Sequence, residues 1–354
     1  MNHRSRPTIN EVAREAKVSI STVSRVFNLK HTGDLEVRER VLEVARKLNY
    51  QPDVAARELV SRRGGSIGFH YWDGGTDTET YYGEVLQGVE GEVRRHNYEL
   101  HVSTSHHLQG VLDNGGTPKS LSGRDIQGVL CAGEMPDELH RAIRRQRLPI
   151  VYINTQYPHD PVDSVMCDNT AALYRVTRWL IKLGHRRIAC IAAQASLKRF
   201  EPRQNVSVKE RLVGYLQAMY EANLVDNVRV EEAPAFTIED GYKAAEKLLS
   251  CNSPPTAVIG LTDELAVGTI QFARQAGIEV PRRLSIVGVN DLPIAQACNP
   301  SLTTVRIFSR EMGQVAFQRL MEIIKDPDQG PRRIDLLCEL VQRDSCAGVD
   351  GQPV

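Results

Sequence analysis

Two short amphipathic helices joined by a tight turn, within the first 27 residues, constrain the fold of this chain more than any other feature. Thr8 followed by Glu11 matches a capping box, which opens the first helix. The apolar residues of this helix recur on one face: Ile9, Val12, Ala13 and Ala16. The turn Lys17-Val18-Ser19 ends in a residue that can cap a second helix, in which Val23 and Val26 point inward. This arrangement predicts a helix-turn-helix unit whose second helix can enter a DNA major groove.

The outer face of the second helix carries two kinds of group that bind DNA. Arginine forms a bidentate fork on guanine, and hydroxyls near a helix start bind phosphates. We assign Ile20, Ser21 and Arg25 to base edges, with Ile20 packing on a thymine methyl. The predicted phosphate contacts are Thr8, Ser19, Thr22, Ser24 and Asn28. Taken alone, the two helices also fit a small helical domain with a solvated hydroxyl face.

A third helix and a short hinge helix follow. Residues 34–48 predict the third helix, whose apolar face carries Val37, Val41, Val44, Ala45 and Leu48. Pro52 ends this stretch, because the residue before a proline avoids the helical region. The hinge helix, at about residues 53–61, is capped by Asp53 and is marginal in water by itself. Its Leu59, with small residues such as Ala56 nearby, suits a wedge that enters the minor groove.

These residues resemble the LacI/GalR family of bacterial repressors. The matching strings are Val12-Ala13, Ala16-Lys17-Val18-Ser19, Thr22-Val23-Ser24-Arg25-Val26, Leu48-Asn49-Tyr50 and the single residues Arg38, Val41 and Pro52. The similarity extends from about Thr8 to about Arg343. It implies that the hinge helices of two subunits pair and insert Leu59 at the centre of an operator. Asp53 and Glu58 depart from the family pattern, and acidic groups close to phosphates weaken binding.

Charge is distributed unevenly along the chain. Residues 1–63 contain 13 Lys or Arg and 8 Asp or Glu, whereas the remaining residues contain 31 and 36. A basic head on an acidic body is typical of nucleic-acid binding by the head. With 354 residues and 41% hydrophobic content, the chain is expected to form two or three globular domains.

The N-terminus and the cysteines indicate a reducing, cytoplasmic location. Residues 1–6 lack the apolar run of a signal peptide, and no stretch of sequence suits a membrane span. The seven cysteines show no Cys-x-x-Cys spacing, so we expect reduced thiols. His106 and His107 have no third ligand in view, so we expect no metal and no cofactor.

From Ser66 onward, short apolar strands alternate with helices in two successive sets. The first set comprises strands at 66–71, 100–103, 128–131 and 149–153 and helices at 82–96 and 138–147, with a loop or weak helix at 106–124. The second set comprises helices at 170–183, 208–222, 238–249 and 264–276 and strands at 188–191, 257–260 and 284–289. Such alternation predicts doubly wound parallel sheets with a ligand cleft at the carboxyl ends of their strands.

The predicted fold class is therefore a small all-α helix-turn-helix headpiece followed by an α/β, two-lobed domain similar to periplasmic binding proteins. The headpiece with its hinge spans 1–63, the effector-binding and dimerisation domain spans 66–343, and a frayed tail spans 344–354. The family resemblance implies that residues 301–307 return the chain to the first lobe. No leucine heptad follows Arg343, so a dimer is expected rather than a tetramer.

The resemblance also implies an effector pocket in the second domain. Its implied contacts are Arg211, the aromatic Phe236, Thr262, Asn290 and Asp291. Thr262 and Asn290 depart from sugar-binding members, which carry an amide and an acid there. Tyr71 and Tyr82, with Trp72 and Tyr81, are candidates for the opposite wall, or for ordinary packing. Asp263 is expected to cap a helix rather than to contact ligand.

The leading hypothesis is a ligand-responsive DNA-binding regulator, a dimeric repressor of sugar-utilisation genes that binds a palindromic operator. Its implied partners are double-stranded operator DNA, a small-molecule effector such as a sugar, and a second copy of the chain, with no membrane. The first alternative is a cytoplasmic sugar-binding protein without DNA regulation, which the basic headpiece disfavours. The second is an enzyme, but no Gly-x-Ser-x-Gly elbow, P-loop or dinucleotide fingerprint is present.

Overall fold

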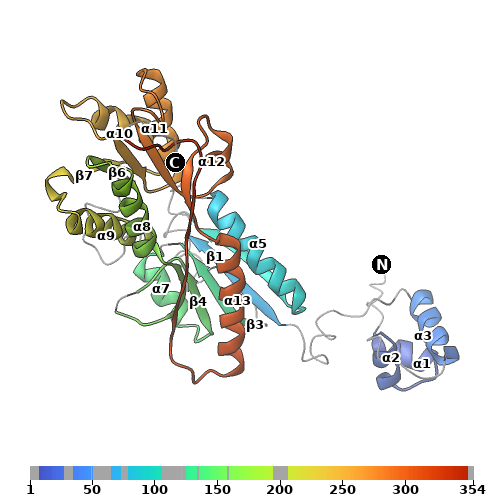
Figure 1. Cartoon of the computed structure of the whole chain (residues 1–354). Coiled ribbons are helices and arrows are strands. Elements are labelled where there is room, and N and C mark those ends of the chain that lie inside the picture. The colour runs from blue at the N-terminus through green and yellow to red at the C-terminus, as the bar shows by residue number, and fades with distance from the viewer. Residues whose placement is uncertain are drawn as a thin grey trace. The chain divides into compact units, whose positions relative to one another are not determined.

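The computed structural model describes residues 8–27, 35–48, 50, 65–72, 79–105, 118, 121, 125–133, 135–157, 159–193 and 206–349. The chain packs as two units, Met1–Gly65 and Ser66–Val354, and each is considered by itself (Figure 1). The predicted hinge helix at 53–61 lies outside the described residues. So does the segment 106–124, except for Pro118 and Leu121.

The described part of the first unit packs as three short helices, which were predicted: α1 (Ile9–Glu15), α2 (Ile20–Phe27) and α3 (Leu35–Lys47). Glu11 Oε2 accepts hydrogen bonds from the Thr8 backbone N at 2.6 Å and from Thr8 Oγ1 at 3.1 Å, which forms the expected capping box. The buried core consists of Val12, Ala13, Ala16, Val23, Val26, Val41 and Ala45. Arg40 Nε donates to the Ala16 carbonyl at 3.1 Å and so attaches α3 to the end of α1.

The second unit begins with a six-stranded sheet in the order β11-β5-β4-β3-β1-β2, in which all neighbouring strands are parallel. Its strands are β1 (Ser66–Trp72), β2 (Glu99–Ser105), β3 (Ile126–Ala132), β4 (Ile150–Ile153), β5 (Asp163–Cys167) and β11 (Arg333–Leu336). One face is covered by α5 (Glu79–Arg95) and α13 (Ser309–Lys325), and the other packs against α7 (Asp137–Arg144). This sheet and its helices form the first lobe.

Helices α5 and α13 lie side by side because two glycines let their backbones touch (Figure 1). A Cβ atom on Gly88 would lie 2.0 Å from the Arg310 carbonyl oxygen, and one on Gly313 would lie 2.2 Å from that of Val85. Any side chain at either glycine would push the helices apart. This contact ties the C-terminal part of the chain to the first lobe.

The second lobe contains a sheet in the order β12-β10-β9-β8-β6-β7, whose strands are parallel except for β12. These strands are β6 (Ile188–Ala193), β7 (Arg229–Ala233), β8 (Ala257–Gly260), β9 (Ser285–Asn290), β10 (Thr303–Arg306) and β12 (Glu339–Val341). Helices α8 (Asn169–Lys182) and α9 (Val206–Glu221) pack together, as do α10 (Ile238–Leu249) and α11 (Asp263–Gln275). The short elements η3 (Val225–Asn227) and α12 (Pro293–Ala297) complete the lobe.

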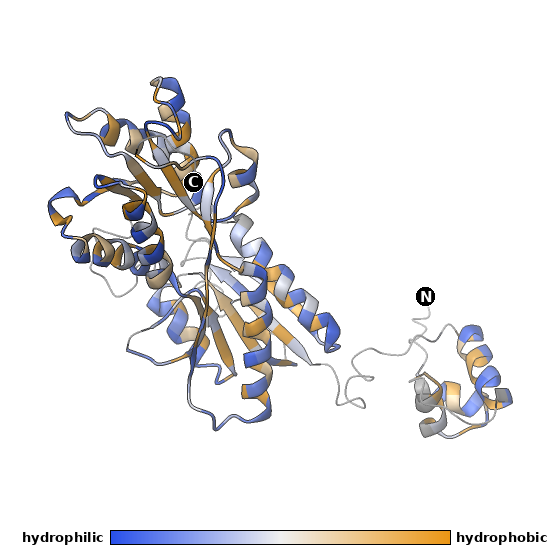
Figure 2. Ribbon diagram, in the orientation of Figure 1, coloured by the Kyte–Doolittle hydropathy of each residue, from blue (hydrophilic) through white to orange (hydrophobic). Residues whose placement is uncertain are grey.

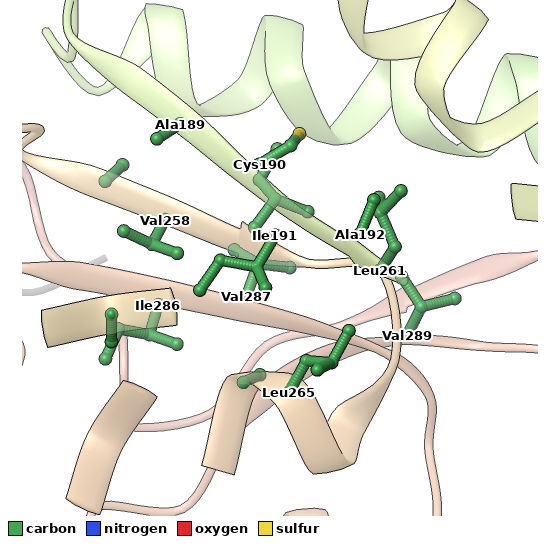
Figure 3. Packing of buried hydrophobic residues seen from close by; sticks show 14 of the residues in the cluster. Ala189, Cys190, Ile191, Ala192, Val258, Leu261, Leu265, Ile286, Val287 and Val289 are labelled. Carbon is green, nitrogen blue, oxygen red and sulfur yellow. The ribbon is translucent and has the colours of Figure 1, made fainter. Parts of the chain in front are cut away.

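The core of the second lobe explains why the sequences of its central strands are continuously apolar. Figure 3 shows Ile191, Val258 and Val287 from three neighbouring strands packed together, with Leu265 of α11 approaching the sheet. A parallel strand covered on both faces has no solvent-facing side, so alternation with polar residues is lost. Figure 2 shows the same contrast, with hydrophobic strands inside each lobe and hydrophilic outer faces on the helices.

The chain passes between the lobes after β5, after β10 and after β11. The prediction that residues 301–307 return the chain to the first lobe is therefore correct only in part. Thr303–Arg306 forms β10 in the second sheet, and the chain enters the first lobe at Ile307, which is buried among the side chains of that lobe.

The prediction of a frayed tail from Asp344 onward is wrong for residues 344–349. Ser345, Cys346 and Ala347 are buried, and Ala347 O accepts hydrogen bonds from Ser285 Oγ at 3.1 Å and lies 3.0 Å from His185 Nε2. The Val349 N–H donates to Leu183 O at 3.0 Å. This segment packs against the start of β9 and the end of α8, and its lack of periodic hydrophobicity hid that role.

None of the helices in the described ranges combines the length and the apolar character that spanning a bilayer requires.

Candidate functional site

A cavity lies between the two lobes of the second unit, at the carboxyl ends of their strands. Thr262 follows β8, Asn290 ends β9, and Asn154 follows β4 of the other lobe. The cavity is lined by Tyr81, Tyr82, Asn154, Ser207, Val208, Arg211, Phe236, Thr262, Asn290 and Ile307. Of the predicted effector contacts, the structure thus brings Tyr82, Arg211, Phe236, Thr262 and Asn290 together.

Arg211 is the most constrained polar group of this cavity. It lies on α9, where Gly214 allows close packing on α8: a Cβ atom there would be 2.1 Å from the Thr170 carbonyl oxygen. The side chain is 4% exposed, and it donates from Nε to Asn169 Oδ1 at 2.9 Å. It also donates to Leu261 O at 2.6 Å and to Asn290 Oδ1 at 3.1 Å. These three bonds fix the guanidinium plane in the cavity wall.

Asn290 owes its position to an unusual turn after β9. Its φ is +118° and that of Asp291 is +57°, values in a backbone region that residues other than glycine seldom occupy. The turn is held by the Asp291 carboxylate, which pairs with Arg306 at 2.7 Å and Arg343 at 2.5 Å. Asp291, predicted to contact ligand, therefore anchors the turn and lies outside this cavity. It lines a neighbouring, wider cavity with Arg306 and the N-terminal residues of α13.

The residue that caps α11 is Thr262, not Asp263 as expected. Thr262 Oγ1 accepts from the Leu265 N–H at 3.5 Å. Asp263 is fully buried and accepts hydrogen bonds from the Leu292 N–H at 2.7 Å and from the Thr304 hydroxyl. Burial raises the pKa of this carboxyl from 3.8 to about 7. Asp263 thus supports the turn after β9 from behind the cavity.

Among the described residues, three aromatic rings contribute to the cavity wall. Phe236 lies just after β7, and Tyr81 and Tyr82 lie in the first turn of α5. Tyr81 donates its hydroxyl to Met312 Sδ at 3.4 Å, and burial raises the pKa of this phenol. Tyr71, a predicted wall residue, does not line the cavity: its buried ring packs 4.2 Å from that of Tyr82. Its position on β1 directs it into the core of the first lobe.

Asn154 and Ser207 were missed by sequence reasoning. Ser207 Oγ donates to Asn154 Oδ1 at 2.5 Å, and this bond joins β4 of the first lobe to α9 of the second. Asn154 has a φ of +59° and directly follows a buried strand, a signal that was available in the sequence. Ser207 carries no comparable signal, because it follows a stretch without hydrophobic periodicity.

The candidate DNA interface belongs to the first unit. Ser19 Oγ accepts from the Thr22 N–H at 3.2 Å, which confirms the predicted cap of α2. Ile20 is 51% exposed, and Thr8 and Ser19 are also exposed. Ser21, Ser24 and Arg25 fall on α2, but their side chains lie outside the described part of the structure. Asn28, Ala56 and Leu59 lie outside the described residues altogether.

Comparison with known proteins identifies both units. Residues 8–53 match the model for bacterial regulatory proteins of the lacI family, and residues 177–346 match that for a periplasmic binding protein-like domain. The ribose operon repressor of Haemophilus influenzae is 31% identical over 348 residues, which cover 96% of this chain and 98% of that protein. The transcriptional repressor PurR of Vibrio vulnificus is 29% identical, with 96% and 98% covered.

Solved structures show the same fold. A Lac repressor dimer bound to operator and the anti-inducer ONPF superposes with a TM-score of 0.80 at 21% identity, covering 97% of this chain and 100% of that one. A complex of the transcriptional regulator CelR with cellobiose gives a TM-score of 0.68 at 26% identity, with 96% and 100% covered. On the combined match of helix-turn-helix unit, two-lobed domain and full-length relatives, this chain belongs to the lacI family of bacterial regulatory proteins.

Proposed function

We propose that this protein is a cytoplasmic, homodimeric repressor that binds a palindromic operator through α2 and releases or tightens its hold when a small molecule enters the cavity between the lobes. The observation that carries the proposal is the capped start of α2, where Ile20 is 51% exposed beside the hydroxyls of Ser19 and Thr22. An exposed apolar side chain at the start of a recognition helix suits a thymine methyl in the major groove.

The cavity supports the ligand-responsive part of the proposal. Its lining comes from both lobes, and Asn154 and Ser207 already join them by a hydrogen bond. A ligand that contacts both walls stabilises one arrangement of the lobes over another, and only such differential binding can shift the equilibrium. The names of relatives, a ribose operon repressor and a regulator complexed with cellobiose, favour a hydroxylated small molecule.

A dimer is favoured by the family and by the geometry that palindromic DNA requires. One of the superposed structures is a Lac repressor dimer on its operator. Two headpieces related by a twofold axis would read half-sites about one helical turn apart, and paired hinge segments at about 53–61 would bend the DNA between them.

Substitution of Arg25 by Ala tests the predicted base contact. We expect a loss of about 1–3 kcal/mol in binding to the preferred operator and a relaxed preference at one base pair, because the guanidinium reads one guanine. Competition binding with a library of singly mutated operators measures both effects. Arg14→Ala, which removes an exposed arginine from α1, is the control and should leave the base preference intact. A uniform loss across all sequences for Arg25→Ala would assign this residue to phosphate.

Substitution of Leu59 by Ala tests the hinge wedge. We expect weaker operator binding with unchanged ligand affinity, because the inserted leucine stabilises the bent DNA and makes that contact only in the complex. Gel-shift titration combined with calorimetry of the DNA-free protein separates the two quantities. Operator affinity equal to that of the unsubstituted protein would contradict the wedge assignment.

The same scaffold would also suit a sugar-binding protein that does not regulate DNA. Such a protein would bind its ligand equally well whether or not α2 can contact DNA, and it would retain no specific DNA fragment. We also propose that the cavity binds its ligand without turnover, as expected from relatives that are repressors.

A further inference from the structure

Arg211 carries a buried positive charge that no acidic side chain neutralises among the described residues. Its hydrogen-bond acceptors are the Asn169 and Asn290 side-chain oxygens and the Leu261 carbonyl, all of them neutral. The nearest acid along the helix, Glu210, is paired with Arg333 at 2.9 Å and reaches Arg211 only through Asn169. A buried ion without a counter-charge is costly, because partial dipoles replace its hydration only in part.

The other deeply buried arginine in the described chain, Arg319, is neutralised by carboxylates. Arg319 is 1% exposed, and it is paired with Asp163 at 2.7 Å and with Glu322 at 2.8 Å. Arg343 and Arg306, less buried, share the carboxylate of Asp291. Carboxylates thus neutralise these arginines, whereas Arg211, which faces the cavity, has no carboxylate partner among the described residues.

Two side-chain amides of the cavity present their nitrogens as hydrogen-bond donors. Asn290 accepts from Arg211 through Oδ1, and Asn154 accepts from Ser207 through Oδ1. In both amides the Nδ2 group donates to no other residue in the described part of the chain. The described lining contains no Asp or Glu. A sugar hydroxyl needs acceptors as well as donors, and carboxylates are its strongest acceptors. This lining instead favours a ligand rich in acceptors.

We propose that the effector of this protein is a small hydroxylated molecule bearing an oxyanion, a carboxylate or a phosphate, that supplies the counter-charge of Arg211. The Nδ2 groups of Asn290 and Asn154 donate to the same anion, and Phe236 covers the apolar part of the ligand. Asn290 determines this specificity, because an acid at the end of β9 would neutralise Arg211 from within the protein. The inference rests on the cavity being the effector site of the proposed regulator.

The first test compares charged and neutral partners of the same shape. Calorimetric titrations of the full chain would use glucuronate against glucose, galacturonate against galactose, and ribose phosphate against ribose. We expect the tightest ligand to be an acid, bound about ten- to a hundredfold more strongly than its neutral counterpart, the range for a hydrogen-bonded charge pair. The uronates and the phosphate distinguish carboxylate from phosphate recognition. A neutral sugar that binds as tightly as its acid would overturn the proposal.

The second test needs no knowledge of the ligand. Asn290→Asp places a carboxylate against Arg211, so this variant should unfold at a higher temperature than the natural chain when no ligand is present. Asn154→Asp adds an acid to the same cavity at a residue that is hydrogen-bonded to Ser207 and not to Arg211, so it is the matched control and should give a smaller gain. Inorganic phosphate, compared with chloride at equal ionic strength, should stabilise the natural chain more than Asn290→Asp. Equal stabilisation of the two proteins by phosphate, or no thermal gain from Asn290→Asp, would contradict the inference.

Operator binding by the same variants, measured without ligand, keeps the two proposals apart. If Asn290→Asp behaves as expected but no chain retains specific DNA, the regulator proposal fails and the charge assignment stands. If all chains bind operator and the charge tests fail, only the inference about the ligand is lost.

Discussion

Replacing Asp163 by Ala is expected to lower the free energy of unfolding by about 3–5 kcal/mol, the cost of removing the buried carboxylate that pairs with the buried Arg319 guanidinium. Asp163 Oδ1 lies 2.7 Å from Arg319 Nε and also accepts from the Arg332 N–H at 3.0 Å. Both bonds are lost together, at the start of β5 where α13 and the strand β11 meet the first sheet. Denaturant unfolding, followed by circular dichroism, measures the change.

The matched control for this prediction is Glu322→Ala. Glu322 contacts the same arginine at 2.8 Å, but its side chain is 55% exposed. An exposed pair contributes about 1 kcal/mol or less, because water screens both charges. If the two variants lose the same free energy of unfolding, the buried pair of Asp163 with Arg319 stabilises the fold no more than the exposed pair with Glu322 does. Ligand affinity should survive in both, since Asp163 lies at the opposite end of β5 from the cavity.

The stability of the protein is expected to fall as pH rises from about 4 to about 7, through the titration of Asp263. Burial raises the pKa of this carboxyl from 3.8 to about 7 in the folded protein. The folded state therefore holds a proton that the unfolded state releases, so that raising the pH across this window favours unfolding. The full loss, reached above pH 7, is about 4 kcal/mol for a shift of about three pKa units.

Asp263→Asn isolates this effect from those of other titrating groups. The amide stays neutral, and it can still accept from the Leu292 N–H while donating to the Thr304 hydroxyl. We expect the stability difference between this variant and the natural chain to grow between pH 4 and pH 7 and then to stay constant. Asp328→Asn, at an exposed position, is the control and should show no such trend. A difference that is independent of pH would show that Asp263 is ionised throughout.

The central strands and most helices were predictable because their signal is local. The runs at 257–260 and 188–191 are apolar since both faces of the sheet are covered, and the helix at 238–249 has the bounds expected from its periodicity. Strands β5, β7, β10, β11 and β12 were not predicted. β5 begins with Asp163, whose burial is possible only because Arg319 lies opposite it, and β7 is an edge strand with charged residues. Helix α13, although amphipathic, was not predicted either.

The cavity was partly predictable for a related reason. Residues that follow apolar strands, such as Thr262 and Asn290, are brought to one edge by parallel topology, and the family resemblance indicated Arg211 and Phe236. The separate roles of Asn290 and Asp291 were not predictable, because they depend on two positive φ values and on arginines that lie more than ten residues away. Tyr71 was misplaced because the side of β1 on which its ring lies is set by packing against Tyr82.

The most direct test of the central claim is to sequence the genomic fragments that the purified full chain retains at physiological salt, with and without a panel of sugars, sugar acids and purines. We expect a palindromic site with half-sites about one helical turn apart, whose retention changes with an acidic ligand and is reduced for Arg25→Ala. Retention of random fragments, unaffected by any ligand and equal for the natural chain and Arg25→Ala, would contradict the claim.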